Sequence, residues 1–85
     1  MFIRSSEFNR QFKKLSPKIK DKTEERLRIL LENEFHPILN NHRLSGKSKN
    51  YRSINITGDF RIVYKVLGGP VYFLVEIGTH SQLYG

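Results

Sequence analysis

The sequence predicts an α+β domain, in which an N-terminal two-helix hairpin packs on one face of a curled antiparallel β-sheet. Apolar residues recur at helical spacing through the first 35 residues, whereas they alternate with polar residues from Arg52 onward. The connections between the alternating segments are short and contain glycine, which is typical of an antiparallel meander. Eighty-five residues are enough for one domain but not for two, so we expect residues 1–85 to form a single domain.

The chain before residue 16 predicts a short edge strand and a first helix. Met1 to Arg4 can form the strand. Ser5 or Ser6 can cap the helix, because a serine oxygen accepts a hydrogen bond from the first helical turn. Three apolar residues recur at positions i, i+4 and i+7, and therefore share the face that we expect to point inward: Phe8, Phe12 and Leu15.

A second helix is predicted from Ser16-Pro17 to about Phe35. Serine is a favourable N-cap, and proline suits the first helical position because its missing N–H has no partner there. His36-Pro37 ends the helix, since proline disfavours helical geometry in the residue before it. The residues expected to face inward are Ile19, Leu27, Leu30, Leu31 and Phe35.

Three strands are predicted after the helices. They lie within residues 51–56, 60–66 and 71–77, and Thr57-Gly58-Asp59 and Gly68-Gly69-Pro70 supply the turns between them. Because the helices can cover only one face of the sheet, we expect the second face to be open to solvent or to a partner. The polar residues expected on this open face are Tyr51, Ser53, Asn55, Arg61, Lys65 and Glu76.

The charge of the chain is strongly positive and uneven. Fifteen Lys and Arg face eight Asp and Glu, for a formal net charge of +7. Residues 10–28 hold eight basic residues against three acidic ones, and residues 41–52 hold four with no acid. Basic stripes attract polyanions and speed association, which favours a nucleic-acid or acidic-protein partner. The alternative is a solvated surface that keeps the protein soluble.

The composition argues against several classes of protein. Without cysteine, neither a disulfide framework nor a thiolate metal site can form. The N-terminus lacks the apolar stretch of a secretory signal, and Val71 to Val75 is far shorter than the roughly 20 residues that span a bilayer. The histidines match no zinc-binding spacing. We therefore expect a cytoplasmic protein that uses no metal or cofactor and does not enter the membrane.

Several residues offer the groups that cleavage of RNA through its own 2′-hydroxyl requires. Histidine exchanges protons near neutral pH, and the arginine fork of donors matches phosphate oxygens. In a meander, the start of the middle strand lies beside the end of the last one, which places Asp59 and Arg61 near Gly78-Thr79-His80. Taken singly, each histidine is more typical of a surface or capping residue. The candidate residues are His42, His80, Asp59, Arg52, Arg61 and Tyr84.

Four segments carry a family resemblance when they are read in order. They are His42–Lys47, Asn50–Ser53, Gly58–Lys65 and Ile77–Tyr84. Their order and spacing resemble the RelE/ParE superfamily of toxins from bacterial and archaeal toxin–antitoxin pairs, and more narrowly its YafQ-like (RelE/StbE) branch. The resemblance is specific from residue 36 to residue 85, and before that it rests only on the basic helical hairpin. It implies the same two-helix, antiparallel-sheet fold.

The resemblance also implies an activity. Members of the YafQ-like branch are messenger-RNA interferases, metal-independent endoribonucleases that cut the messenger in the ribosomal decoding site. Matched positions imply that His80 is the general acid or base and that His42 is its counterpart. Asp59 would orient a histidine, and Tyr84 would position the substrate. Arg61, where many wider relatives carry arginine, would stabilise charge on phosphorus together with Arg52. The basic residues expected to contact messenger or ribosomal RNA are Arg52, Arg43, Lys47, Lys49, Lys13, Lys14 and Lys18.

Two positions depart from the YafQ-like pattern. Asn55 stands where that pattern has a histidine, and Glu76 stands where it has a catalytic arginine. We expect Arg61 or Arg52 to pair with Glu76 and to supply the missing positive charge. The departures keep two alternatives open: a ParE-type toxin that binds DNA gyrase without cutting RNA, and an inactive relative that still binds an antitoxin.

The resemblance implies a protein partner. Toxins of this superfamily are held inactive by a cognate antitoxin, which we expect to be a short acidic chain that offsets the charge of +7. Its C-terminal segment would fold on binding, as a helix in a groove or as a strand added to the sheet edge. A heterotetramer with the antitoxin is one assembly that the resemblance allows.

Overall fold

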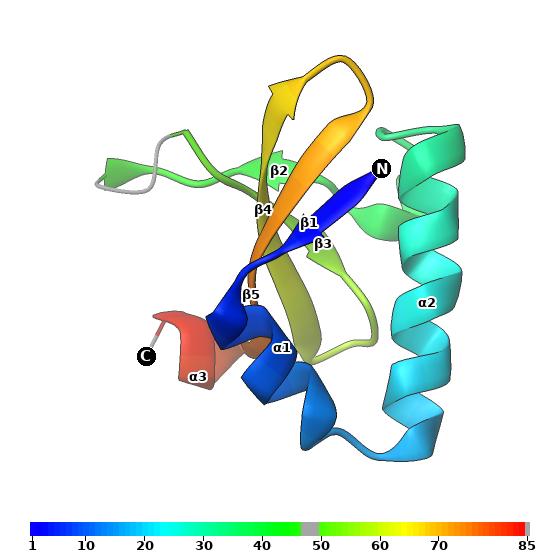
Figure 1. Cartoon of the computed structure of the whole chain (residues 1–85), viewed down its shortest axis with the longest axis vertical. Helices are drawn as coiled ribbons and strands as arrows, with labels where there is room; N and C mark the ends of the chain where they lie inside the picture. The colour runs from blue at the N-terminus through cyan, green and yellow to red at the C-terminus, as the bar shows by residue number, and fades with distance from the viewer. Residues whose placement is uncertain (47–49, 85) are drawn as a thin grey trace.

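The computed structural model describes residues 1–46 and 50–84 and contains two main helices against a five-stranded sheet (Figure 1). The strand order is β1-β5-β4-β3-β2. The strands are β1 (Phe2–Arg4), β2 (His42–Arg43), β3 (Arg52–Asn55), β4 (Phe60–Gly68) and β5 (Val71–Thr79). The helices are α1 (Ser6–Lys13), α2 (Pro17–Glu32), the 3-10 helix η1 (Pro37–Leu39) and α3 (His80–Tyr84).

The predicted α+β architecture and the β3–β4–β5 meander are confirmed, because both strand pairs are antiparallel. The predicted N-terminal edge strand also forms. It runs parallel to β5, with Phe2 opposite Tyr72 and Arg4 opposite Leu74, so the sheet as a whole is mixed. None of the described helices is both long and apolar enough to cross a membrane.

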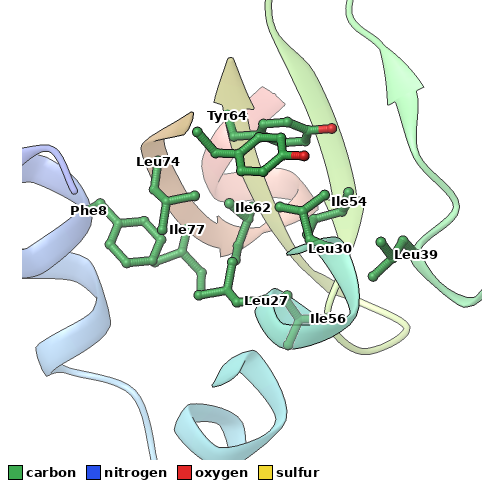
Figure 2. Packing of buried hydrophobic residues seen from close by; sticks show 11 residues of the cluster. Phe8, Leu27, Leu30, Leu39, Ile54, Ile56, Ile62, Tyr64, Leu74 and Ile77 are labelled. Atoms are coloured by element: carbon green, nitrogen blue, oxygen red, sulfur yellow. The ribbon is translucent and has the colours of Figure 1, made fainter. Parts of the chain in front are cut away.

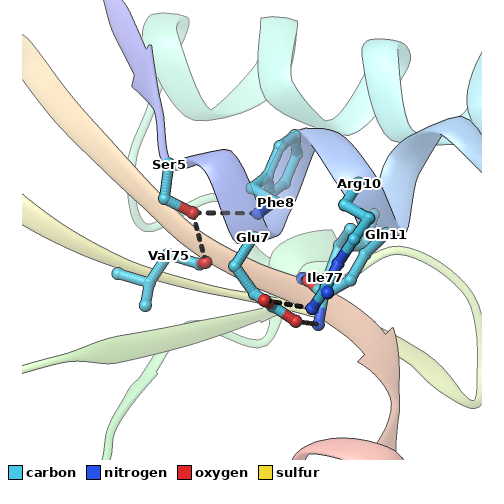
Figure 3. A network of polar contacts seen from close by, with 7 residues as sticks. All are labelled: Ser5, Glu7, Phe8, Arg10, Gln11, Val75 and Ile77. Atoms are coloured by element: carbon cyan, nitrogen blue, oxygen red, sulfur yellow. Dashed lines mark hydrogen bonds and ion pairs between the residues drawn. The ribbon is translucent and has the colours of Figure 1, made fainter.

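The N-cap residue and one side chain of α1 continue the hydrogen bonding of β5 beyond the end of β1 (Figure 3). Ser5 is the predicted N-cap: its Oγ accepts a bond from the Phe8 amide at 2.9 Å and donates to the Val75 carbonyl at 2.7 Å. The Gln11 Oε1 accepts a bond from the Ile77 amide at 2.8 Å. Backbone groups of β5 are thereby satisfied by side chains, which fixes α1 against the strand.

The second helix begins as predicted, with Ser16 as the N-cap and Pro17 in the first position, but it ends at Glu32. Asn33 leaves the helical conformation, and its side chain accepts a hydrogen bond from the Phe35 amide at 3.2 Å, which favours a turn. The predicted extension to Phe35 is therefore wrong.

Two residues of that region were predicted to face inward and do not. Leu31 is 45% exposed and Phe35 is 62% exposed. The buried stripe of α2 follows Leu27 and Leu30, and Leu31 lies about 100° further around the helix. Phe35 lies beyond the helix end, where the Arg52 guanidinium sits 5.1 Å from its ring centroid.

The core lies between the helices and one face of the sheet (Figure 2). Tyr64 is its largest fully buried side chain. The Tyr64 hydroxyl donates to Glu34 Oε2 at 2.8 Å and accepts a bond from Asn41 Nδ2 at 2.6 Å, so the polar end of this side chain is satisfied. Burial raises the pKa of Tyr64. The remaining members of the cluster are Phe8, Leu27, Leu30, Leu39, Ile54, Ile56, Ile62, Tyr72, Leu74 and Ile77.

Candidate functional site

Two short elements that the sequence analysis did not predict shape the open face of the sheet. His42 and Arg43 lie outside the three predicted meander strands but form β2, in which His42 lies opposite Ser53 of β3. The chain after β5 turns at once into α3, which begins at His80. Ser53 alternates with core residue Ile54 and so faces away from the main helices. Because the Tyr84 hydroxyl donates to Ser53 Oγ at 2.9 Å, α3 covers part of the face that was expected to be open.

Four of the six candidate residues, His42, Arg61, His80 and Tyr84, come together in one cleft of about 340 Å³. They reach it from three elements, β2, β4 and α3. The predicted approach of the middle strand to the end of the last strand is confirmed, since Arg61 lies opposite Gly78 and the His80 amide donates to the Asp59 carbonyl at 3.1 Å. The cleft is lined by His42, Arg43, Leu44, Ser45, Arg61, His80 and Tyr84.

His80 and Tyr84 form one unit at the wall of this cleft. Their ring centroids are 4.9 Å apart, and the rings meet edge to face. The Tyr84 hydroxyl proton is engaged by Ser53, which is fully buried. Tyr84 therefore offers the cleft an aromatic surface beside the His80 imidazole, rather than a free proton donor.

The imidazole of His42 is oriented by the backbone before β2. His42 Nδ1 lies 3.1 Å from the carbonyl oxygen of Asn40, a residue in the left-handed conformation with φ of 46°. Because a carbonyl only accepts hydrogen bonds, Nδ1 carries the proton in this arrangement. The lone pair of the neutral ring then lies on Nε2, which can accept a proton.

Arg61 is held in the cleft by Asn55. The Arg61 guanidinium donates to Asn55 Oδ1 at 2.7 Å, and the two residues lie opposite each other on β4 and β3. A guanidinium has five N–H donors, so others remain for an anion. Asn55, which replaces a histidine of the YafQ-like pattern, thus orients a cation here. Sequence reasoning missed this role, although a pair of polar residues on neighbouring strands is a signal for it.

In the part of the chain that the structure describes, neither Asp59 nor Glu76 makes the side-chain contact that was predicted for it. Asp59 does not line the cleft, and it contacts His80 through its backbone carbonyl. Glu76 lies opposite Val63. Among the described residues, no cation lies within ion-pair distance of the Glu76 carboxylate. The predicted pairing with Arg61 or Arg52 is absent because their hydrogen bonds go to Asn55 and Asn41.

Arg52 lies on the other side of the sheet from His80. It is opposite Tyr64, whose side chain is in the core, and its Nε donates to Asn41 Oδ1 at 2.8 Å. Arg52 lines a different cleft of about 290 Å³ with Asn50 and Val66. Arg43 lines both this cleft and the His80 cleft, so it is the cation that connects them.

The lysines predicted to bind RNA lie away from the cleft. Lys13, Lys14 and Lys18 are exposed around the connection between α1 and α2. Lys14 also lines a third cleft, of about 560 Å³, between α1 and the ends of the central strands. Lys47 and Lys49 lie outside the described residues. Within the described chain, no three His, Asp or Glu side chains cluster in a way that could hold a metal ion.

Comparisons with known proteins agree with the overall fold. A family model described as a bacterial toxin of type II toxin-antitoxin system, YafQ, matches residues 2–85. The crystal structure of YafQ from E. coli strain BL21(DE3) superimposes with a TM-score of 0.84 at 21% identity, covering 100% of this chain and 98% of that one. A chain of the E. coli DinJ–YafQ toxin–antitoxin complex gives 0.76 at 26% identity, with coverage of 100% and 97%.

A chain of the heterotetrameric YoeB–YefM toxin–antitoxin complex from Staphylococcus aureus gives a TM-score of 0.81 at 20% identity, covering 94% of this chain and 95% of that one. A sequence comparison with curated proteins gives no match. The family match spans nearly the whole chain and includes every described residue of the His80 cleft. The chain therefore belongs to the YafQ family and is a bacterial toxin of the type II toxin–antitoxin class.

Proposed function

We propose that this toxin is a metal-independent endoribonuclease that cleaves messenger RNA at the ribosome through attack of the RNA 2′-hydroxyl. The observation that carries the proposal is the convergence of His42, Arg61 and His80 on one cleft. Two imidazoles can serve as base and acid near neutral pH, and a guanidinium can stabilise the charge that develops on the phosphate.

In this reaction, His42 Nε2 takes the proton of the 2′-hydroxyl, because its Nδ1 is committed to the Asn40 carbonyl. The 2′-oxygen then attacks phosphorus, and the P–O5′ bond breaks. His80 gives its proton to the departing 5′-oxygen. The products are a 2′,3′-cyclic phosphate and a 5′-hydroxyl end, and the two histidines finish with exchanged protonation states.

The other residues of the cleft support the two histidines. Arg61, oriented by Asn55, binds the phosphate oxygens. Tyr84 sets the plane of the His80 ring and offers a surface for the sugar or base. Asp59 acts through its backbone, which holds His80 at the start of α3.

The remaining basic residues would bind RNA away from the scissile phosphate. Arg43 lies between two clefts and can follow the messenger backbone toward Arg52. The exposed Lys13, Lys14 and Lys18 would contact ribosomal RNA, since exposed cations bind phosphate without sequence preference. We propose the same RNA-binding role for Lys47 and Lys49. Action on the messenger at the ribosome would place the protein in the cytoplasm.

An acidic antitoxin would keep this activity in check. The E. coli YafQ and S. aureus YoeB neighbours occur in structures with DinJ and YefM, one of them heterotetrameric. With its net charge of +7, this chain would attract an acidic partner, and a heterotetramer is the assembly that we propose.

A ribosome assay tests the nuclease proposal. Purified protein is added to ribosomes paused on a defined messenger, and the new RNA ends are mapped for the native chain and for His42→Ala and His80→Ala. His36→Ala is the matched control, because His36 caps η1 through Nδ1 and does not line the cleft. We expect the two cleft variants to lose cleavage by at least about 100-fold, as for the loss of a general acid or base.

Native-level cleavage by His80→Ala would exclude the proposed acid. If the native protein leaves the messenger intact on ribosomes, the same sample is tested for inhibition of DNA supercoiling by gyrase. Inhibition would support the ParE-type alternative, and inactivity in both assays would support the antitoxin-binding relative without nuclease activity.

A further inference from the structure

Helix α3, which carries both His80 and Tyr84, is too short to be stable by itself. Helix α3 has five residues. Forming a first helical turn fixes several backbone dihedrals for one hydrogen bond, so an isolated helix of this length is not stable. The placement of the His80 imidazole therefore depends on contacts that hold α3 at its ends.

A pair of reciprocal hydrogen bonds holds the start of α3. The Gln82 amide donates to Thr79 Oγ1 at 3.2 Å, and the Thr79 amide donates to Gln82 Oε1 at 2.8 Å. Together they form a capping box, in which each side chain satisfies a free N–H of the first turn. His80 lies inside the box, directly after the capping residue.

The preceding strand makes room for this arrangement. A Cβ atom added to Gly78 would lie 2.9 Å from Gln82 Oε1 and 3.4 Å from Leu83 Cδ2. Gly78 has no positive φ, so its backbone conformation does not demand glycine. The requirement is space, because the Gln82 side chain occupies the volume that any other residue would fill at position 78.

Gln82 acts from outside the cleft in which His80 lies. It lines the neighbouring cleft with Arg10 and Gln11 and is absent from the lining that His42, Arg61 and His80 share. At the opposite end of α3, the Tyr84 hydroxyl is bound to buried Ser53. The turn is thus fixed at both ends. At the His80 end, the capping box acts together with the Asp59 carbonyl, which accepts a hydrogen bond from the His80 amide at 3.1 Å.

We infer that Gln82 is a positioning residue: its side-chain oxygen, seated over Gly78, holds the first turn of α3 and so sets the position of the His80 imidazole. The inference rests on the proposed role of His80 as the acid of the cleavage reaction. The capping box gives Gln82 a hydrogen-bonding role that a carboxylate can fill and a hydrocarbon side chain cannot.

Two substitutions at Gln82 separate this role from simple packing. Gln82→Leu keeps a side chain of similar size but removes the acceptor, whereas Gln82→Glu keeps an acceptor oxygen for the Thr79 amide. Gly78→Ala should displace Gln82 without changing it. Gly58→Ala is the matched control, since a Cβ there meets nothing within 4 Å and Gly58 has no positive φ.

The measurements are single-turnover cleavage on ribosomes, the imidazole NMR signals of His80 and thermal unfolding. We expect Gln82→Leu and Gly78→Ala to lower the cleavage rate constant roughly 10- to 100-fold, the effect of a misplacement of about 1 Å. The KM should change much less, and the His80 signals should shift. Gln82→Glu and Gly58→Ala should keep rates within about threefold of the native rate and native His80 signals.

The inference would be overturned if folded Gln82→Leu had native cleavage rates and native His80 signals. It would also be overturned if Gln82→Glu lost the native rate and the native His80 signals. If the native chain does not cleave RNA at all, the proposed function fails, and the NMR signals still decide the positioning role. Shifted His80 signals in Gln82→Leu, but not in Gln82→Glu, would then support it. Unchanged signals in both would overturn it.

Discussion

The Arg61 guanidinium donates a hydrogen bond to Asn55 Oδ1 at 2.7 Å, from the central strand β4 to its neighbour β3. This contact explains how a chain with asparagine in place of the histidine of the YafQ-like pattern can still present an ordered cation to the cleft. The amide oxygen fixes one edge of the guanidinium and leaves other donors for phosphate.

The first prediction concerns this pair. Asn55→Ala should lower the single-turnover cleavage rate about 10-fold, because Arg61 then loses its fixed orientation while keeping its charge. The rate is measured on ribosomes with a saturating amount of protein. Asn9→Ala, an exposed change on α1, should leave the rate constant unaltered. An Asn55→Ala enzyme with the native rate would show that Arg61 needs no partner.

The second prediction compares Arg61 with Arg52, which were both expected from the sequence to stabilise charge on phosphorus. Arg61→Ala should reduce the cleavage rate constant by about 100-fold or more, because it removes the charge that stabilises the transition state. Arg52→Ala should leave that rate constant near native and act on stability or RNA affinity, since Arg52 binds Asn41 and lies against Phe35. Equal losses in the two rate constants would contradict the separation of the two arginines by the sheet.

The third prediction addresses the far end of α3. Tyr84→Phe should lower the free energy of unfolding by about 1 kcal/mol, because it removes the hydrogen bond to Ser53 and leaves a buried hydroxyl unpaired. Urea unfolding of Tyr84→Phe, Ser53→Ala and the double variant measures the coupling between the two side chains. We expect the two single losses to be non-additive. Additive losses would mean that the contact contributes nothing to stability.

The fourth prediction is a loss of stability at alkaline pH. Burial raises the pKa of Tyr64 and, to a lesser degree, of Tyr72. In the unfolded chain a tyrosine ionises near pH 10, whereas the folded protein keeps these hydroxyls protonated, so the unfolded state releases protons first. The contribution of these tyrosines to the free energy of unfolding is therefore fully present below about pH 10. It decreases as the pH rises further toward the folded-state pKa.

Tyr64→Phe provides the control for this effect. Urea unfolding between pH 8 and pH 11 should give a shallower decline for Tyr64→Phe than for the native chain, although the variant starts from a lower stability because Glu34 and Asn41 lose their partner. Parallel declines in the two proteins would show that Tyr64 does not carry the alkaline loss.

Local signals in the sequence predicted most of the fold. Ser5 and Ser16-Pro17 cap their helices as expected, because these signals act within one turn. The end of α2 was missed because Asn33 closes a turn through its own side chain, which the apolar spacing does not reveal. The parallel pairing of β1 with β5 depends on residues about seventy positions apart, beyond the reach of a local pattern.

Most residues of the candidate site were predicted from the sequence, but the short elements that position them were not. The meander brings Arg61 and His80 together, and short turns are enough to specify that approach. The separation of Arg52 from the cleft also follows from strand alternation, because Arg52 shares a face with core residue Ile54. The capping box was present in the sequence as Thr79-x-x-Gln82, a signature that predicts a helix start and that was overlooked because no apolar periodicity follows it.

The proposed function requires that His80 takes part in cutting messenger RNA. Its most direct test is inducible expression without an antitoxin, with 5′-end mapping of cellular messengers, for the native chain and for His80→Ala at equal soluble levels. We expect the native chain to stop growth and to leave new 5′-hydroxyl ends inside coding regions, and His80→Ala to do neither. New ends produced equally by both chains, or arrested growth without new ends, would contradict it.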